Sequence, residues 1–355
     1  MIESVFAHSH ARRARIRTFA TRVEAEQFLA RQKVDVAGGQ WISPAAGRTT
    51  LATYSAGWMA VQPWRPATVD ATTAVLARVH AAFGDRTLTS LRTSEIQAWA
   101  LQLEDRYAPS TVEGTVRLLR AILRAAVADR VIARSPADGV RLRRREGAIV
   151  VPLTVEQVRA LADAAPAGLS AAVVLTACTG LRQGELFGLT VDRVAWLKRE
   201  IVVDRQLVTP SSGPPAFGPC KTSRSVRTVP VADHALAVLA EHVRRHGHGA
   251  DGLLFHRDGK PWPRDRGAEA FKRLAKAAEV ETSGWHALRH HCASVLIAAG
   301  LSVTAVAAVL GHSPAECLAT YAHWWPSEHE QIRAGVAQAW ERVADSTRTE
   351  PGAGH

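Results

Sequence analysis

Residues 109–130 carry the feature that most constrains the fold of this chain, a long run of apolar residues at helical spacing. The apolar positions are Val112, Val116, Leu119, Ile122, Leu123 and Val127. This spacing predicts one long helix with a single buried face, and such a helix is stable only when neighbouring helices cover that face. The segment therefore predicts a helical bundle around it.

The preceding sequence supplies further helices for this bundle. The predicted helices cover residues 50–61, 66–83 and 93–103. Pro63 and Gly84 end the first two, and Thr93 is a possible N-cap of the third. We interpret residues 48–140 as one helical domain.

The positive charge of the chain gathers in the same region. Residues 106–145 hold ten arginines against three acidic residues, and the whole chain has a net charge of +11. Nucleic acid is the simplest partner for such charge, and a merely basic globular protein is the alternative. We expect phosphate contacts from the long helix and from an Arg-rich linker at residues 141–151; the alternatives are a solvated face with a Glu113–Arg117 pair and a solvated tether. The candidate DNA-binding residues are Arg117, Arg120, Arg124, Arg141, Arg143, Arg144 and Arg145.

Residues 1–47 give weaker signals. Residues 12–19 alternate loosely and predict at most one strand. Thr21, followed three residues later by Glu24, predicts a capping box that opens a helix at residues 21–32. Glycine and proline residues then interrupt regular structure before the helical domain begins.

The pattern changes at residue 152, and residues 152–345 predict a mostly helical domain with a small antiparallel sheet. Strands are expected at residues 200–208 and 225–231, with a turn-rich excursion at residues 210–219. A helix begins at Thr154, and further helices are predicted at residues 168–178, 232–245, 265–279, 286–299, 303–310, 314–323 and 326–343. Residues 346–355 are expected to be a disordered tail. The fold class is therefore mainly α, with an α+β second domain.

Composition also limits the function. The four cysteines have no paired spacing, so neither a zinc site nor a disulfide framework is indicated. No apolar run reaches the roughly 18 residues of a membrane span, and no signal peptide opens the chain. We expect a cytoplasmic protein with reduced thiols, no membrane partner, and no metal or other cofactor.

Two pairs of charged residues have the spacing of helix neighbours. Arg182 and Glu185 are three residues apart, as are His286 and Arg289, so each pair shares a helix face. Arginine binds two phosphate oxygens through its planar fork and keeps its charge. Each pair taken alone is also compatible with an ordinary ion pair or with chance.

Three further residues complete a set suited to metal-free phosphodiester chemistry. Lys221 precedes a predicted strand and can release a proton where an arginine cannot. His312 lies between two predicted helices, and Tyr321 follows it. An unperturbed tyrosine has a pKa near 10, so Tyr321 needs activation as a nucleophile. The alternatives are a surface lysine, a helix-terminus histidine and a packed core tyrosine.

The short motifs around these residues, in this order, resemble the tyrosine recombinase (phage integrase) family, of the phage or actinobacterial type. The motifs are Thr179-Gly180-Leu181-Arg182, Cys220-Lys221-Thr222, His286-Ala287-Leu288-Arg289-His290 and Leu310-Gly311-His312, with Tyr321 after them. The resemblance covers roughly residues 49–345 and is most specific in the C-terminal half. It gives His291 no role.

The resemblance implies a site-specific DNA recombinase that integrates or excises a phage or mobile element. Tyr321 is implied to attack the scissile phosphate and form a 3′-phosphotyrosine, while Lys221 protonates the 5′-oxygen. It also implies that His286 assists proton transfer and that Glu185 orients its neighbouring arginine. The implied ligands of the transition state are Arg182, Arg289 and His312.

The resemblance also implies a domain organisation and partners. Residues 48–140 would be a core-type DNA-binding domain, residues 152–345 the catalytic domain, and residues 1–47 a shortened arm-binding module. One hypothesis is that the natural start lies further upstream. The implied partners are double-stranded attachment sites, a synaptic tetramer assembled through the terminal helix, and an accessory DNA-bending or directionality factor.

Two other functions remain open from the sequence. A type IB topoisomerase shares the nucleophile and much of the site, but the helical domain and the histidine pair favour a recombinase. A decayed integrase would bind DNA without catalysis, and the intact set of residues argues against it.

Overall fold

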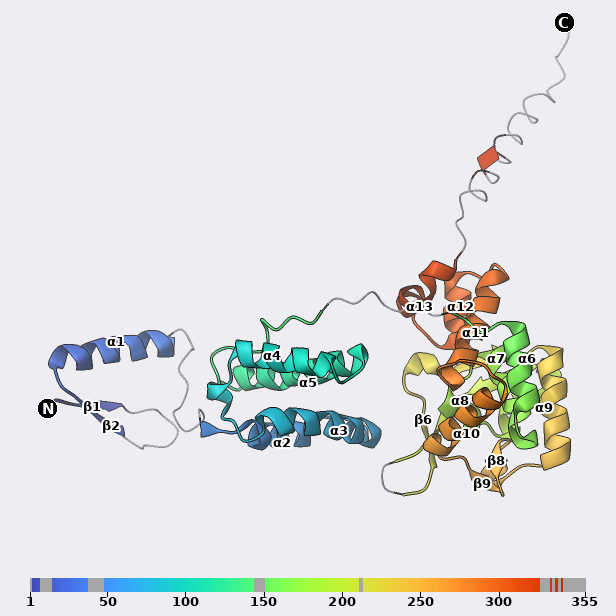
Figure 1. The fold of residues 1–355 in the computed structure, drawn as a ribbon, viewed down its shortest axis with the longest axis horizontal. Helices are drawn as coiled ribbons and strands as arrows, with labels where there is room; N and C mark the ends of the chain where they lie inside the picture. The colour runs from blue at the N-terminus through green and yellow to red at the C-terminus, as the bar shows by residue number, and fades with distance from the viewer. Residues whose placement is uncertain are drawn as a thin grey trace, which may run out of the picture. The chain divides into compact units, whose positions relative to one another are not determined.

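The structure is a computed structural model, and it describes residues 2–6, 15–37, 48–143, 151–210, 213–325, 333, 336–337 and 340. The chain divides into two compact units, residues 1–147 and 148–355. Each unit is described by itself, with the element labels of Figure 1. Arg144, Arg145 and the expected tail at residues 346–355 lie outside the described residues.

The N-terminal segment contains a strand pair and a helix. The elements are β1 (Ile2–Phe6), β2 (Arg15–Phe19) and α1 (Arg22–Ala37). The strands pair antiparallel, so the prediction of at most one strand is wrong. No glycine, proline or asparagine follows β1 to mark a turn, which explains why the hairpin is hard to see in the sequence. The predicted cap is confirmed, because Thr21 Oγ1 accepts the Glu24 N–H at 3.3 Å.

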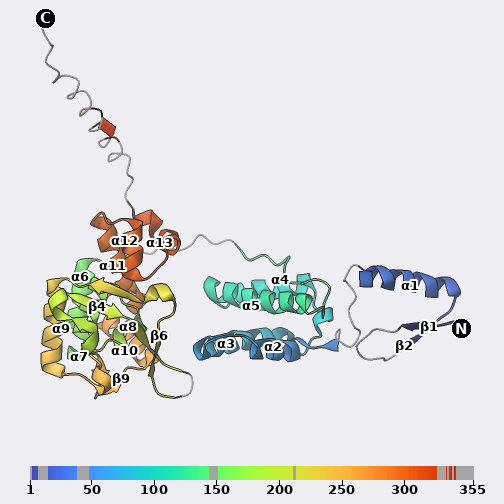
Figure 2. The same ribbon diagram turned by 180° about the vertical axis from the view of Figure 1, so that it is seen from behind.

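The predicted four-helix domain is present in the first unit. Its helices are α2 (Leu51–Ala60), α3 (Pro66–Phe83), α4 (Thr93–Glu104) and α5 (Pro109–Ala128). α5 contacts the other three, and the two views show α4 and α5 layered on α2 and α3 (Figures 1 and 2). The apolar stripe of α5 is buried except for Val127, which is half-buried. Arg92, and not Thr93, occupies the N-cap of α4, where the Glu95 carboxylate accepts the Arg92 N–H at 3.1 Å.

The second unit is mostly helical, as the sequence predicts. Its helices are α6 (Val155–Ala164), α7 (Ala167–Thr179), α8 (Gln183–Phe187), α9 (Asp233–His246), α10 (Arg264–Ala277), α11 (Trp285–Ala298), α12 (Val303–Leu310) and α13 (Pro314–Tyr321). α7 is apolar on nearly every face and packs against α6, α9 and α11, which places it inside the main core.

The strands of this unit form small antiparallel sheets. β3 (Val194–Ala195), β4 (Glu200–Val203) and β7 (Arg227–Pro230) make one sheet in the order β3-β4-β7. The two further pairs are β5 (Arg205–Val208) with β6 (Ala216–Pro219), and β8 (His256–Arg257) with β9 (Lys260–Pro261).

The predicted strand at residues 200–208 and the predicted excursion at residues 210–219 need correction. The chain breaks at Asp204, so that β4 and β5 belong to different sheets. β6 lies within the expected excursion, where Phe217 stands opposite Leu207. Its glycine and proline neighbours hide this short strand from composition.

A smaller core is formed where α11, α12 and α13 meet, at the end of the unit away from the β8–β9 hairpin (Figures 1 and 2). Its fully buried members are Ala293, Ile297, Val306, Ala307, Leu310, Cys317 and Tyr321. The candidate nucleophile therefore lies inside a packed cluster. Among the helices that the structure describes, none is long and apolar enough to cross a membrane.

Candidate active site

Arg182 and Glu185 form the predicted ion pair at the start of α8. Arg182 Nη1 lies 2.9 Å from Glu185 Oε1, and the other carboxylate oxygen accepts the Arg182 backbone N–H at 3.0 Å. The pair follows Gly180, which ends α7 in the left-handed region at φ 64°. A Cβ at Gly180 would meet Leu310 Cδ2 at 2.6 Å, so this turn requires glycine.

Arg227 is a second partner of Glu185 that the sequence analysis misses. It donates from Nη2 to Glu185 Oε2 at 2.9 Å, and its side chain is 6% exposed. Burial alone would raise the pKa of the Glu185 carboxyl, but the hydrogen bond and charge of Arg227, followed by those of Arg182, hold that pKa below its usual range. Glu185 is therefore an ionised carboxylate clamped between two guanidinium groups. Arg227 lies in the same motif as Lys221, which is the signal that was available.

Arg289 is fully buried on α11, as a phosphate ligand in a closed site would be. Its Nη1 donates to Gly180 O at 2.6 Å, and its Nη2 donates to Leu310 O at 2.5 Å and to His312 Nε2 at 2.8 Å. Burial and then the Arg182 charge lower the pKa of Arg289 to about 9, which leaves it protonated at neutral pH.

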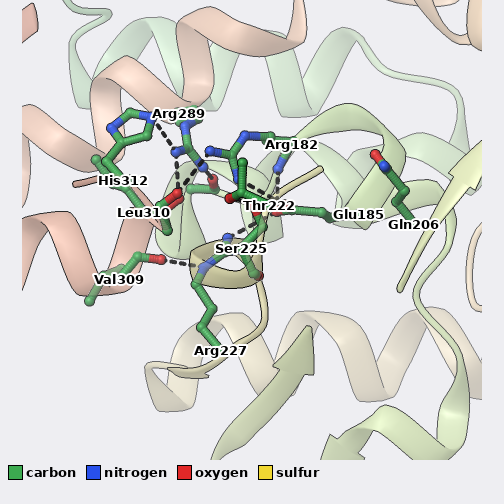
Figure 3. Close-up of polar contacts among 12 residues, drawn as sticks. Arg182, Glu185, Gln206, Thr222, Ser225, Arg227, Arg289, Val309, Leu310 and His312 are labelled. Carbon is green, nitrogen blue, oxygen red and sulfur yellow. Dashed lines mark hydrogen bonds and ion pairs between the residues drawn. The ribbon is translucent and has the colours of Figure 1, made fainter. Parts of the chain in front are cut away.

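The end of α12 holds all three arginines at consecutive carbonyl groups (Figure 3). Val309 O accepts Arg227 Nε at 2.7 Å, and Leu310 O accepts Arg289. Gly311 O accepts Arg182 Nη2 at 3.1 Å. The last carbonyls of a helix carry partial negative charge and lack intrahelical donors, so they suit guanidinium groups.

His312 follows this turn, and its protonation state follows from its partner. Because a guanidinium only donates, His312 Nε2 must accept from Arg289, and the ring proton must lie on Nδ1. Burial and then the charges of Arg289 and Arg182 lower the pKa of His312 to about 4. The ring is thus neutral at physiological pH and can donate through Nδ1.

Tyr321 is fully buried at the end of α13, with its ring stacked on Trp324 at 4.9 Å. The hydroxyl lies 3.1 Å from His290 Nδ1 on α11, and the ring is nearly parallel to His312 at 6.3 Å. Burial raises the pKa of Tyr321 to about 12, although the Arg289 charge opposes this. His290 is thus a site residue to which the sequence analysis gives no role, although it lies four residues after His286 on the same helix.

The other two histidines of α11 differ in environment. His286 packs edge-to-face on His290 at 4.5 Å and keeps an exposed surface; the partial burial of its ring, followed by the charges of His290 and Arg289, lowers its pKa. His291 is buried on another side of the helix, where its Nδ1 lies 2.7 Å from Leu153 O. His291 therefore fixes α11 to the segment before α6, a structural role that the sequence does not reveal.

Lys221 is exposed in the segment after β6, directly before the 3-10 turn η5 (Ser223–Ser225). That turn reaches the arginine cluster through Ser225, whose Oγ accepts from Arg182 Nη1 at 3.4 Å. The five other expected catalytic side chains on α8, α11, α13 and the α12–α13 turn lie near one another, whereas Lys221 and His286 stay on the exposed side of the group.

The candidate DNA-binding arginines that the structure describes have varied partners. On α5, Arg117 is exposed, and exposed Arg124 pairs with Asp138 at 3.0 Å. Arg120 is half-buried and donates to the carbonyls of Ala137 and Val140, so much of it holds a turn of its own unit. The backbone of Arg141 exchanges two hydrogen bonds with Gln97, and Arg143 pairs with Glu104 at 3.3 Å.

The neutral histidines predict acid sensitivity. We expect the free energy of unfolding of the full chain to fall as pH drops from about 6.5 to about 4, because unfolded histidines take up protons that folded His312 refuses. His290 and His286 shift in the same direction, and the lowered pKa of Glu185 adds a further loss at lower pH. Urea unfolding at several pH values would show this. The loss over that window should be smaller in His312→Gln, and an equal loss would contradict this assignment.

Comparison with known proteins gives a family. The Phage integrase family model matches residues 152–328. The putative prophage phiRv2 integrase of Mycobacterium tuberculosis (strain CDC 1551 / Oshkosh) is 26% identical over 344 residues, which cover 92% of this chain and 89% of that protein. The integrase of Mycobacterium phage D29 is 27% identical over 241 residues, 64% of this chain and 63% of its own.

Solved structures agree at the level of fold. The Tn1549 transposon integrase in complex with a circular intermediate DNA has a TM-score of 0.71 at 22% identity, and the match covers 82% of this chain and 99% of that one. A lambda integrase dimer bound to a COC′ core site has a TM-score of 0.59 at 18% identity, over 79% of this chain and 97% of that one. The family match spans every expected catalytic residue from Arg182 to Tyr321, and the chain belongs to the phage integrase family of tyrosine recombinases.

Proposed function

We propose that Tyr321 is the nucleophile of this site-specific recombinase and that the arginine cluster binds the scissile phosphate. Tyr321 Oη attacks phosphorus to give a 3′-phosphotyrosine, and Lys221 protonates the departing 5′-oxygen. Arg182, Arg289 and His312 stabilise the charged transition state. Glu185 orients Arg182, and rejoining reverses the chemistry, so the phosphotyrosine keeps the bond energy and neither ATP nor a metal is consumed.

One observation carries this proposal. Among the described residues, two buried N–H groups of the site have no hydrogen-bond partner, Arg289 Nε and His312 Nδ1. A buried polar group left unpaired is costly, and unpaired donors are expected where a ligand completes the site. Two such donors beside a guanidinium cluster fit the negative oxygens of a phosphodiester, and the buried phenol of Tyr321 supplies the nucleophile.

The proposed partner is double-stranded DNA at an attachment site, bound in part by α5 and by Arg141–Arg145, in a protein that works in the cytoplasm. We expect the Arg117→Ala/Arg124→Ala double variant to lower the slope of log affinity against log salt by roughly 2, since each lost phosphate contact removes about 0.9. Binding titrations from low to moderate salt would measure it. Arg244→Ala/Arg245→Ala, which removes two arginines paired with Glu241, is the control. An unchanged slope in the α5 variant would exclude these contacts.

Self-association on DNA is proposed through the terminal segment. Val336 and Trp340 are helical and 54% and 70% exposed, so they do not pack on the core of their own unit. Their apolar surface suits docking on a second protomer in a closed assembly. We expect Val336→Ser/Trp340→Ser to abolish synapsis in mass photometry while single-site binding persists. Leu197→Ser, at a fully exposed leucine elsewhere, should leave synapsis intact, and equal synapsis in both variants would refute the docking.

The function itself is tested without knowing the site. Tagged wild-type and Tyr321→Phe proteins are incubated with genomic DNA in EDTA, quenched in SDS and captured under denaturing conditions, and the attached DNA is sequenced. Enrichment by the wild type alone at one or a few loci is the expected result. Enrichment everywhere would favour a topoisomerase, and equal background from both would indicate a binder without catalysis.

A further inference from the structure

We propose that His290 accepts the proton of the Tyr321 hydroxyl as its oxygen attacks phosphorus, which makes His290 a catalytic residue. The proposal rests on the recombinase chemistry proposed above, and it adds the group that activates the nucleophile. It separates His290 from His286, the histidine of the family motif.

The contact between the two side chains is specific. His290 Nδ1 lies 3.1 Å from Tyr321 Oη, and the two rings meet at 73° with centroids 5.6 Å apart. Trp324 stacks on Tyr321 and stands edge-on to His290 at 6.3 Å. His286 covers another side of His290 at 4.5 Å. Aromatic neighbours therefore hold both rings in register.

The protonation states follow from this environment. Burial and then the Arg289 charge lower the pKa of His290, so its imidazole is neutral at physiological pH. The raised pKa of Tyr321 keeps its hydroxyl protonated. The hydroxyl can then donate to an unprotonated Nδ1, which requires the tautomer of His290 with its proton on Nε2. In that arrangement the base already points its lone pair at the proton that must leave.

The other groups around the hydroxyl are less suited to this step. His312 lies parallel to the Tyr321 ring, and its acceptor nitrogen is taken by Arg289. His286 contacts His290 in the described structure. Among the residues that the structure describes, His290 supplies the hydrogen-bond partner of the Tyr321 hydroxyl.

The step balances without another reactant. The Tyr321 Oη–phosphorus bond forms while the phosphorus–O5′ bond breaks. The phenol proton passes to His290 Nδ1, and the Lys221 ammonium group gives a proton to O5′. In rejoining, the 5′-hydroxyl attacks phosphorus, Lys221 recovers its proton, and the His290 imidazolium returns the other proton to Tyr321.

The test compares single-turnover cleavage of a duplex that carries the sequence captured by the wild type. Asparagine places an oxygen close to the position of Nδ1 but cannot take up a proton. We therefore expect both His290→Asn and His290→Ala to form the covalent adduct roughly 100-fold or more slowly, with DNA affinity unchanged. His234→Asn, at an exposed site on α9, is the matched control and should cleave at the wild-type rate.

Two chemical substitutions separate a base from a merely structural residue. A fluorinated tyrosine at position 321 is more acidic and needs less help, so it should narrow the gap between the wild type and His290→Asn. A 5′-bridging sulfur needs no proton on leaving, so it should rescue Lys221→Ala but not His290→Asn. Cleavage by His290→Asn at the wild-type rate, or a gap that fluorination leaves constant, would overturn the proposal. Absence of adduct from the wild type would instead contradict the proposed function.

Discussion

The Glu185→Gln variant is expected to lose about 3 kcal/mol of unfolding free energy, since removal of one partner from a buried ionic cluster leaves the others uncompensated. Glu185 is 4% exposed and accepts from Arg182 and Arg227. Glutamine keeps the size of the side chain, but it removes the charge and turns an N–H₂ group toward guanidinium donors. Urea unfolding at pH 7 measures the loss, and adduct formation should fall with it.

Glu241→Gln is the matched control for this result. Glu241 also bridges two arginines, Arg244 and Arg245, but it does so on the surface of α9. Solvent screens that cluster, so its loss should be far smaller. Similar losses in the two variants would show that the Glu185 cluster gains nothing from its burial.

The Arg289→Lys variant is expected to cleave roughly 10³-fold more slowly while it retains DNA affinity, because oriented donors to a developing negative charge contribute on this scale. Arg289 holds Gly180 O, Leu310 O and His312 at once and keeps Nε free of protein partners in the described structure. A lysine ammonium group is a point charge without that planar fork, so it cannot reproduce all four directions.

Single-turnover adduct formation beside an equilibrium binding curve separates chemistry from affinity in this variant. Arg273→Lys, at an arginine of α10 whose side chain is 73% exposed, should change neither quantity. If Arg289→Lys cleaved within a few-fold of the wild type, the charge alone would suffice and the fork geometry would be irrelevant.

The sequence predicts much of this protein because its helices carry strong local signals. The stripe on α5 and the capping residues of α6, α12 and α13 announce their elements, and short motifs locate Arg182, Arg289, His312 and Tyr321. Such signals need only a few neighbouring residues, so they survive without knowledge of tertiary contacts.

The features that the sequence hides depend on contacts between distant segments. Arg227 looks like an ordinary strand residue until Glu185 and Val309 are placed beside it, and His290 until Tyr321 is. The β1–β2 and β5–β6 hairpins are short and lack clear turn signals, so their pairing is decided by the partner strand. The assignment of Arg120 to DNA ignores the carbonyls of Ala137 and Val140, which only folding brings within reach.

The last turn of α12 acts as a common mount for the catalytic charges. Three arginines from three different elements are seated on Val309, Leu310 and Gly311, and the next residues along the chain lead through His312 into α13 and its tyrosine. A small rotation of α12 would therefore tilt every phosphate ligand together and shift the nucleophile with them. Such a site is aligned or misaligned as a whole, so a recombinase built this way can switch one protomer off without disturbing a single catalytic side chain.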